Sequence, residues 1–249
     1  MSEFLNKVVV ITGGNSGIGE AITHKFNECG AKIVIFDRTD RSQLETQHQQ
    51  LKQGIFVQGD IRNLADIERL YKETDHAFGK IDILVANAGV AGKRSVDEVS
   101  EDFFDELVDT NFKGLYFTVQ RAIPRLNTGS SVVLISSAVR YAGLRNDSVY
   151  SSTKAAVSTL SRNFAADLIG RGIRVNAISP GYTDTPIFDK IRKHYPQKIQ
   201  EFTKAIPIGR FATPSEIAEA VLFLSSTNSS YIVGSDLVID GGASSIYPL

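Results

Sequence analysis

The chain has 249 residues, 42% hydrophobic and 22% charged, with a formal net charge of -1 at pH 7, so it can bury a full core but offers no strong field to nucleic acid or an anionic membrane. No apolar run approaches the ~18 residues of a membrane-spanning helix, and the N-terminal residues lack the apolar region of a signal peptide. A single cysteine, Cys29, excludes an intrachain disulfide, and together these features predict a cytoplasmic protein that binds neither nucleic acid nor membrane.

Predicted strands and helices alternate along the chain. Short β-branched or apolar runs predict strands at 8–11, 32–36, 55–58, 81–86, 131–136, 173–178 and 237–239. Helical spacing of apolar residues predicts helices after Gly19 and at 64–78, 103–126, 150–169 and 215–224. Repeated β-α units are typical of a parallel sheet with right-handed crossovers. We therefore predict an α/β fold: a single domain over residues 1–249, built on a doubly wound, Rossmann-like parallel sheet with helices on both faces.

The first predicted strand is followed by a glycine-rich turn and then by a helix. Its sequence has the form Thr12-Gly13-x-x-x-Gly17-x-Gly19. Glycine permits a tight turn and a close approach of backbone N–H groups to a pyrophosphate. The N-terminus of the following helix adds unpaired N–H groups and partial positive charge. The turn therefore predicts dinucleotide binding, although an ordinary strand–loop–helix connection has the same pattern.

Polar or small residues end the next three predicted strands, at the edge where ligands of such sheets bind. Asp37 comes 18 residues after Gly19, close to the offset of about 20 at which an acid binds the adenosine ribose. Asp60 ends the third strand and Asn87-Ala88-Gly89 ends the fourth, where small residues let the backbone lie against a ligand. Taken alone, a plain turn at these strand ends would look the same.

The sharpest chemical signal is the pair Tyr150 and Lys154, in the sequence Tyr-Ser-Ser-Thr-Lys. Residues four apart share one helix face, so the phenol and the ammonium can meet at one ligand. A free tyrosine has a pKa near ~10 and is a poor base at neutral pH, so we expect the Lys154 cation, helped by the positive charge of an oxidised nicotinamide, to lower the pKa of Tyr150. The same pair is also common on exposed helices. Ser137 ends the fifth predicted strand, with Ser136 as the alternative serine, and Asn111 stands in the middle of a predicted helix.

Together with the glycine turn, the order of four residues resembles the catalytic set of the short-chain dehydrogenase/reductase family: Asn111, Ser137, Tyr150 and Lys154. The resemblance covers about residues 7–242. It implies that Tyr150 is the general acid or base, that Ser137 hydrogen-bonds the substrate oxygen, and that Lys154 tunes Tyr150 and holds the nicotinamide ribose. It further implies that Asn111 holds a water linking Lys154 to solvent.

The same resemblance implies a nicotinamide cofactor at the carboxyl ends of the strands. Asp60 would meet the adenine amino group, Ile61 would pack on the ring, and Thr183, where the family usually has Ile or Val, would offer its backbone N–H to the carboxamide. The implied cofactor-binding residues are Gly13, Asn15, Ser16, Gly17, Ile18, Gly19, Asp37, Arg38, Asp60, Ile61, Asn87, Ala88, Gly89, Tyr150, Lys154, Pro180, Gly181, Thr183 and Thr185. The four histidines show no ligand spacing, so we predict no metal site.

We predict NAD rather than NADP as the cofactor. The carboxylate of Asp37 can accept hydrogen bonds from both ribose hydroxyls and would repel a 2′-phosphate. Arg38, directly after it, is the competing feature, because arginine is well shaped to bind phosphate. Asn15 and Ser16 stand in the glycine turn where NADP-using relatives carry a basic residue.

Residues 184–206 form a long stretch with apolar residues at near-helical spacing, interrupted by Pro196. The pattern predicts a lid that closes over the substrate pocket, or equally a helix packed on the body. Arg140 and Arg145 lie in the loop before the Tyr150 helix, where they would contact a substrate carboxylate or phosphate, or remain solvated.

We predict an oxidoreductase that transfers a hydride between a nicotinamide cofactor and a secondary alcohol or ketone. The alternative is a non-catalytic dinucleotide-sensing protein of the same fold, against which the complete catalytic set argues. A sugar-nucleotide epimerase or dehydratase usually has a longer C-terminal substrate domain. The resemblance also implies a homotetramer. The small-molecule substrate stays open among polyols, hydroxysteroids, acyl-thioester ketones and small ketones.

Overall fold

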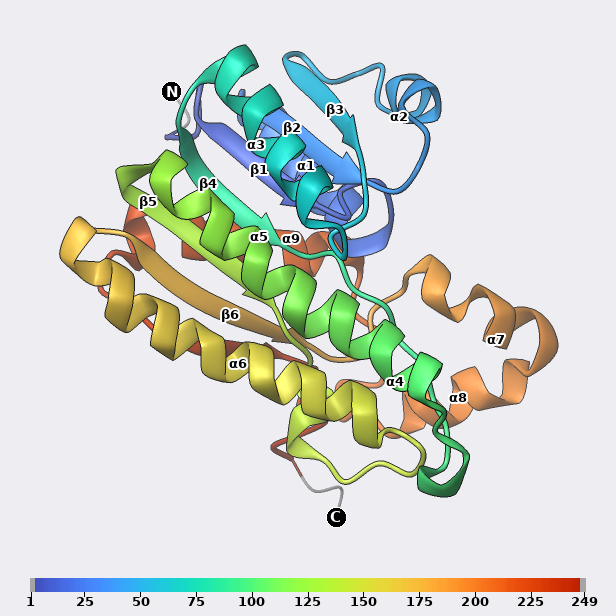
Figure 1. Ribbon diagram of the computed structural model, residues 1–249. Helices are drawn as coiled ribbons and strands as arrows, with labels where there is room; N and C mark the ends of the chain where they lie inside the picture. The colour runs from blue at the N-terminus through green and yellow to red at the C-terminus, as the bar shows by residue number, and fades with distance from the viewer. Residues whose placement is uncertain (1–2, 247–249) are drawn as a thin grey trace.

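The computed structural model describes residues 3–246. Seven parallel strands form one sheet in the order β3-β2-β1-β4-β5-β6-β7 (Figure 1). The strands are β1 Val8–Thr12, β2 Lys32–Asp37, β3 Gly54–Gln58, β4 Ile81–Ala86, β5 Leu126–Ile135, β6 Arg174–Pro180 and β7 Asp236–Ile239. The strand order reverses between β1 and β4, and ligands of such sheets bind at the carboxyl ends near this reversal.

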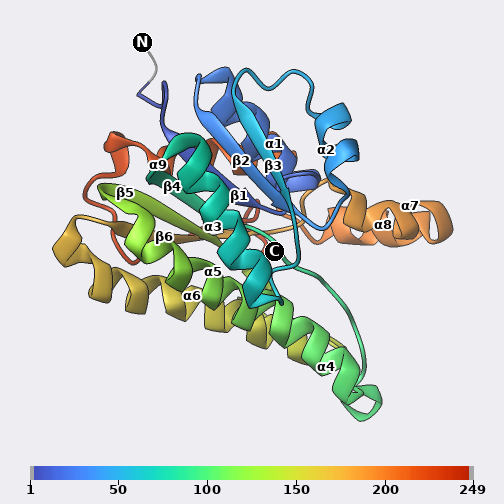
Figure 2. The same ribbon diagram turned by 45° about the horizontal axis from the view of Figure 1, so that its top comes forward.

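Helices cover both faces of the sheet, as predicted. On one face lie α1 Gly17–Glu28 and α9 Pro214–Ser225; on the other lie α3 Leu64–Phe78, α5 Leu115–Ala122 and α6 Ser148–Leu168 (Figures 1 and 2). The two resulting layers of core follow the apolar pattern of the sequence: Phe26 of α1 and Val221 of α9 pack in one, and Leu70 of α3 and Phe164 of α6 in the other. Strands buried on both faces read as continuous apolar runs, which is why the sequence located them.

The helix predicted at 103–126 is interrupted in the structure. It consists of α4 Glu101–Val108, a π-helical segment Asp109–Gly114 and then α5. A 3₁₀ turn with Pro124 near its start ends the helix, and Leu126 is the first residue of β5 rather than the last of the helix. The π-helical segment contains Asn111, and such segments often occur at functional sites.

The structure also contains a short helix that the sequence pattern did not predict, α2 Arg41–Gln47, between β2 and β3. Its N-cap Asp40 accepts a hydrogen bond from the N–H of Ser42, and it buries only Leu44. A single buried position leaves too little apolar periodicity to detect.

The segment 184–206 folds into two short helices, α7 Asp189–His194 and α8 Pro196–Lys204. Pro196 begins the second helix, where its missing N–H is not needed. Figure 2 shows both helices extending away from the body. An aromatic cluster of Tyr182, Phe188, Phe202 and Phe211 joins them to the segments on either side. Within the described residues, no helix is long and apolar enough to cross a membrane.

Candidate active site

The glycine turn after β1 is held against the end of β4. Gly13 has a φ of 65°, and a Cβ on Gly19 would overlap the carbonyl oxygen of Gly13. The side-chain amide of Asn87 donates to the carbonyl oxygens of Thr12 and Gly13, each at 3.0 Å. In return, Thr12 Oγ1 accepts from the N–H groups of Asn87 and Ala88 at 3.1 Å. These contacts explain the polar end of β4, which the sequence alone could not distinguish from a plain turn.

The first turn of α1 is open to an anion. Ser16 is its N-cap residue, but the Ser16 side chain makes no capping hydrogen bond, whereas Asn63 and Thr213 cap α3 and α9. The α1 N–H groups therefore remain available, as a pyrophosphate site requires. Gly17 lies against Thr185, since a Cβ on Gly17 would be 3.1 Å from the methyl carbon of that threonine. Tertiary folding thus brings the loop after β6 to the glycine turn.

The acids at the ends of β2 and β3 have different surroundings. Asp37 Oδ1 accepts from the N–H of Thr39 at 2.9 Å and from its hydroxyl at 2.7 Å. Both oxygens of Asp60 accept from the guanidinium of Arg62, and these hydrogen bonds lower the pKa of Asp60. Ile61 packs in the core and is only 5% exposed, so its side chain offers little surface to an adenine ring. Arg38 is exposed.

The catalytic candidates meet where β5 ends and α6 begins. Lys154 is 4% exposed; its Nζ donates to the carbonyl oxygen of Ile135 at 2.9 Å and lies 5.9 Å from the ring centre of Tyr150. Ser137 hydrogen-bonds the Tyr150 side chain. Ser136 instead donates to the backbone oxygen of Lys154 at 2.7 Å, so it anchors α6. The geometry therefore favours Ser137 over Ser136 as the serine beside the phenol.

Burial governs the protonation of this pair within the chain itself. Burial raises the pKa of Tyr150; the hydrogen bond from Ser137 opposes the shift, and the negative charge of Asp147 adds to it. Burial also lowers the pKa of Lys154 to about 8. The expected lowering of the Tyr150 pKa depends on Lys154 together with the positive charge of an oxidised nicotinamide, so for the complex with the cofactor it stays a prediction; within the chain itself desolvation dominates at both groups.

Asn111 holds the segment after β4 in place. Its Oδ1 accepts from the N–H of Val90 and its Nδ2 donates to the carbonyl oxygen of Val90, both at 2.8 Å. The Nδ2 group also donates to Thr153 Oγ1 at 3.3 Å. Gly89 lies between Asn111 and Lys154, because a Cβ on it would be 3.1 Å from Asn111 Oδ1 and 3.3 Å from Lys154 Nζ. Val90 and Thr153 had no signal in the sequence.

The segment after β6 lies at the same carboxyl edge of the sheet as the glycine turn. Pro180 ends the strand, and Gly181 lies so close to the backbone of Asp240 that a Cβ on it would be 2.7 Å from the Cα of that residue. The Thr183 hydroxyl donates to the carbonyl oxygen of Gly181 at 3.1 Å, so the side chain is turned inward and is buried. The bridge between Thr183 and Ala212 uses the N–H groups of Asp184 and Ala212. The N–H of Thr183, which the family resemblance assigns to the carboxamide, takes no part in this bridge.

The two arginines of the loop before α6 differ. Arg140 pairs with the buried Asp236 of β7 at 2.8 Å and donates to Ser179 Oγ at 3.2 Å, while its guanidinium stacks on Tyr141 at 3.7 Å. It therefore ties this loop to β6 and β7 and is not free to bind a substrate anion. Arg145 is exposed. Within residues 3–246, no group of three or more His, Cys, Asp or Glu side chains is placed to hold a metal ion.

Comparison with known proteins places this geometry in a family. Residues 13–244 match a family model described as Enoyl-(Acyl carrier protein) reductase. An oxidoreductase from Thermotoga maritima is 35% identical over 98% of this chain and 99% of its own length. L-fucose dehydrogenase from Mus musculus is 34% identical, covering 98% and 90%, and 3-oxoacyl-[acyl-carrier-protein] reductase FabG from Thermotoga maritima is 34% identical, covering 95% and 97%.

Solved structures agree with these sequence matches. Levodione reductase has a TM-score of 0.92 and 30% identity, with 98% of this chain and 100% of that chain covered. A variant of actinorhodin polyketide ketoreductase with NADPH has a TM-score of 0.91 and 26% identity, covering 99% and 100%. The chain therefore belongs to the short-chain dehydrogenase/reductase family and is an oxidoreductase that transfers a hydride between a nicotinamide cofactor and a secondary alcohol or ketone.

Proposed function

We propose that Tyr150 is the general acid–base of this reaction, with Ser137 and Lys154 as its partners. What carries the proposal is the meeting of these three side chains where β5 ends: Ser137 hydrogen-bonds the phenol, and Lys154 Nζ lies 5.9 Å from the ring centre of Tyr150. When bound, the nicotinamide supplies or takes up the hydride. The uncapped start of α1 would hold the pyrophosphate, and Asp37 would hold the adenosine ribose.

The three side chains divide the proton chemistry. Because burial raises the pKa of Tyr150, its phenol is protonated at neutral pH and can donate a proton to a ketone oxygen. In the reverse direction, Tyr150 takes the proton of the alcohol, so oxidation is favoured by higher pH. Ser137 orients the phenol and hydrogen-bonds the same substrate oxygen. Lys154 holds the nicotinamide ribose.

A substrate panel tests this function directly. Absorbance of the reduced nicotinamide follows turnover of L-fucose, a 3-oxoacyl thioester, a cyclic diketone, hydroxysteroids and small secondary alcohols. We expect at least one alcohol–ketone pair to be converted. Tight cofactor binding without turnover on the whole panel would instead favour the dinucleotide-sensing alternative.

We also propose a preference for NAD over NADP, set by Asp37. The hydrogen bonds from Thr39 occupy Oδ1 and leave Oδ2 for the ribose hydroxyls. A 2′-phosphate would bring like charges together, which costs several kcal/mol. Against this stands Arg38, exposed and adjacent.

The substitution Asp37→Ser tests this preference. We expect the ratio of kcat/KM with NADH to kcat/KM with NADPH to fall at least about tenfold, because the repulsion is lost and each ~1.4 kcal/mol is a factor of ten. Glu45→Gln, which removes an exposed carboxylate from α2, is the control for general charge effects. A wild-type preference for NADPH, or an unchanged ratio in Asp37→Ser, would contradict the proposal.

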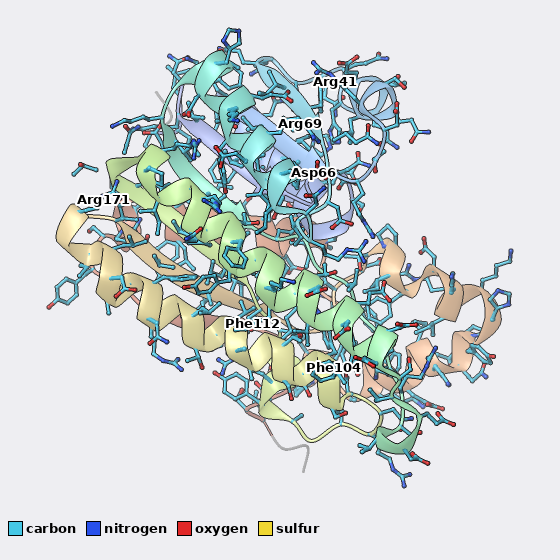
Figure 3. The ribbon with its side chains drawn as sticks, in the orientation of Figure 1. Arg41, Asp66, Arg69, Phe104, Phe112 and Arg171 are labelled. Carbon is cyan, nitrogen blue, oxygen red and sulfur yellow. The ribbon has the colours of Figure 1, made fainter. Side chains whose placement is uncertain are left out.

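We further propose a homotetramer with two kinds of interface. On one face, Phe104 is 47% exposed beside a largely apolar groove of about 360 Å³ between α4 and α6, lined in part by Val108 and Phe112 (Figure 3). On the other, Phe223 of α9 and Leu237 of the edge strand β7 are exposed. Two separate self-complementary faces are what a tetramer of two-fold symmetry needs.

Light scattering measures this assembly. We expect a mass near four times the 27.2 kDa of one chain at micromolar concentration. Phe104→Asp should reduce this mass to half, because it places a charge at an exposed position of one apolar face only. Val96→Asp changes an exposed residue that does not line the groove and belongs to neither α9 nor β7, and it should leave the mass unchanged. A monomeric wild type would contradict the tetramer.

Three further proposals concern the organisation of the chain. We propose that residues 1–249 act as a single cofactor-binding and catalytic domain, supported by the one continuous sheet. We propose that α7 and α8 form a lid over the substrate, supported by their extension from the body and by the stacking of Phe202 of α8 on Tyr182. A cytoplasmic location is proposed from the single free Cys29.

A further inference from the structure

A buried histidine outside the catalytic set is connected to the acid that would bind the ribose. His48 follows α2, is 2% exposed, and lies with its Nε2 3.0 Å from Oδ1 of Asn15 in the glycine turn. We propose that His48 is a positioning residue that fixes the carboxylate of Asp37 through Asn15 and Thr39, and so strengthens discrimination against a phosphorylated adenosine ribose. The inference rests on the proposed binding of NAD at Asp37.

The direction of each hydrogen bond follows from the carboxylate. Asp37 Oδ1 can only accept, so the Thr39 hydroxyl, 2.7 Å away, donates to it. Thr39 Oγ1 must then accept from Asn15 Nδ2, at 3.1 Å. This leaves Asn15 Oδ1 as an acceptor toward His48, so Nε2 of the imidazole carries the proton. A series of three hydrogen bonds therefore runs from His48 through Asn15 and Thr39 to Oδ1 of Asp37. We call this series the chain of donors.

The surroundings of His48 keep this donor in place. The imidazole ring stacks on Phe56 with centroids 6.0 Å apart. The backbone N–H of His48 donates to the carbonyl oxygen of Leu44. Among the described residues, the other ring nitrogen, Nδ1, is buried without a hydrogen-bond partner, as suits the unprotonated nitrogen of a neutral ring.

Burial keeps the ring neutral although two carboxylates lie near it. Burial and the nearby His24, whose ring centre lies 5.8 Å away, lower the pKa of His48, while Glu20 and Asp37 oppose the shift. His48 therefore remains a neutral donor at pH 7 and above.

The chain of donors joins three separate segments: the glycine turn, the end of β2 and the end of α2. Asp37 Oδ1 is held twice by Thr39, and Thr39 is held in turn by Asn15. A carboxylate fixed in this way cannot rotate away from a 2′-phosphate. Loss of the His48 donor would free Asn15 to turn, and Asp37 could then yield to the phosphate.

Two variants of His48 separate packing from hydrogen bonding. His48→Phe keeps an aromatic ring against Phe56 but lacks the donor, whereas His48→Gln keeps an N–H donor at a similar reach. Dissociation constants for NADH and NADPH are measured by nicotinamide fluorescence, with thermal unfolding in parallel. We expect the NADH preference to fall at least fivefold in His48→Phe and to recover in His48→Gln. His24→Phe changes the neighbouring ring, which is not in the chain of donors, and should leave the preference unchanged.

A second background shows whether the effect passes through Asp37. In Asp37→Ser, adding His48→Phe should not change the ratio of the two dissociation constants further, because the positioned group is gone. If Asp37→Ser lowers the preference but folded His48→Phe keeps it within twofold of wild type, the role of His48 is overturned and that of Asp37 stands. If Asp37→Ser leaves the preference unchanged, the proposed function of Asp37 fails, and the inference with it.

A variant at Thr39 covers the case in which His48→Phe does not fold. Thr39→Val breaks the same chain of donors at a half-buried position, and Thr39→Ser restores the hydroxyl. A loss of NADH preference in Thr39→Val with recovery in Thr39→Ser supports the proposal. An unchanged preference in Thr39→Val overturns it.

Discussion

Replacing Tyr150 by Phe is expected to lower kcat by about a hundredfold to ten-thousandfold, the range in which general acid–base groups contribute. Tyr150 lies beside Ser137 and Lys154, and we assign proton transfer to its phenol alone. Phe removes the hydroxyl and keeps the ring. The dissociation constant for NADH should stay within threefold, since the ring and Lys154 remain. Steady-state kinetics on the converted substrate pair and fluorescence titration with NADH measure the two quantities.

The control for this substitution is Tyr231→Phe, which removes a hydroxyl from a fully exposed tyrosine and should leave kcat unchanged. Activity of Tyr150→Phe close to that of wild type would show that another group transfers the proton. Loss of NADH binding together with kcat would show that the phenol serves the cofactor and not the chemistry alone.

Replacing Lys154 by Met is expected to abolish activity and yet to stabilise the protein without cofactor by about 2 kcal/mol at pH 7. Burial lowers the pKa of Lys154 from 10.5 to about 8, and each unit of pKa corresponds to about 1.4 kcal/mol spent on burying the charge. Loss of the hydrogen bond from Lys154 to the carbonyl oxygen of Ile135 reduces this gain in stability by about 1 kcal/mol. Denaturant unfolding gives the free energy, and Lys72→Met on the exposed face of α3 is the matched control, expected within about 0.5 kcal/mol of wild type.

The pH dependence of this difference identifies its cause. Below pH 8 the ammonium is charged in both the folded and the unfolded chain, so the folded wild type bears the full cost of burying it. As pH rises from about 8 toward 10.5, the folded protein loses this proton first and the wild type gains stability relative to the variant. The stabilisation by Lys154→Met should therefore be largest below pH 8 and shrink above it. A difference that does not change with pH would point to packing instead of charge.

Local patterns were sufficient to predict most of the sheet and the glycine turn, whereas the set of catalytic candidates came from the family resemblance. The central strands β1, β2 and β4 are buried on both faces and so appear as apolar runs. The predicted helix 64–78 and strand 81–86 have the bounds of α3 and β4. Tyr150 and Lys154 share a helix face by their spacing alone. The glycine turn was readable because its backbone geometry depends on residues that are adjacent in the chain.

Partners from distant segments could be read only from the tertiary structure. Arg140 finds Asp236 because β7 lies beside β6, and Asn111 meets Val90 because a π-helical segment turns it toward the loop after β4. Periodicity reports which face of an element is buried, but it does not say which residue of another element that face meets. For the same reason the raised pKa of Tyr150 was missed: burial is its largest cause, and burial depends on the assembled fold. His48 shows this limit most clearly, since its connection to Asp37 passes through two side chains from two other segments.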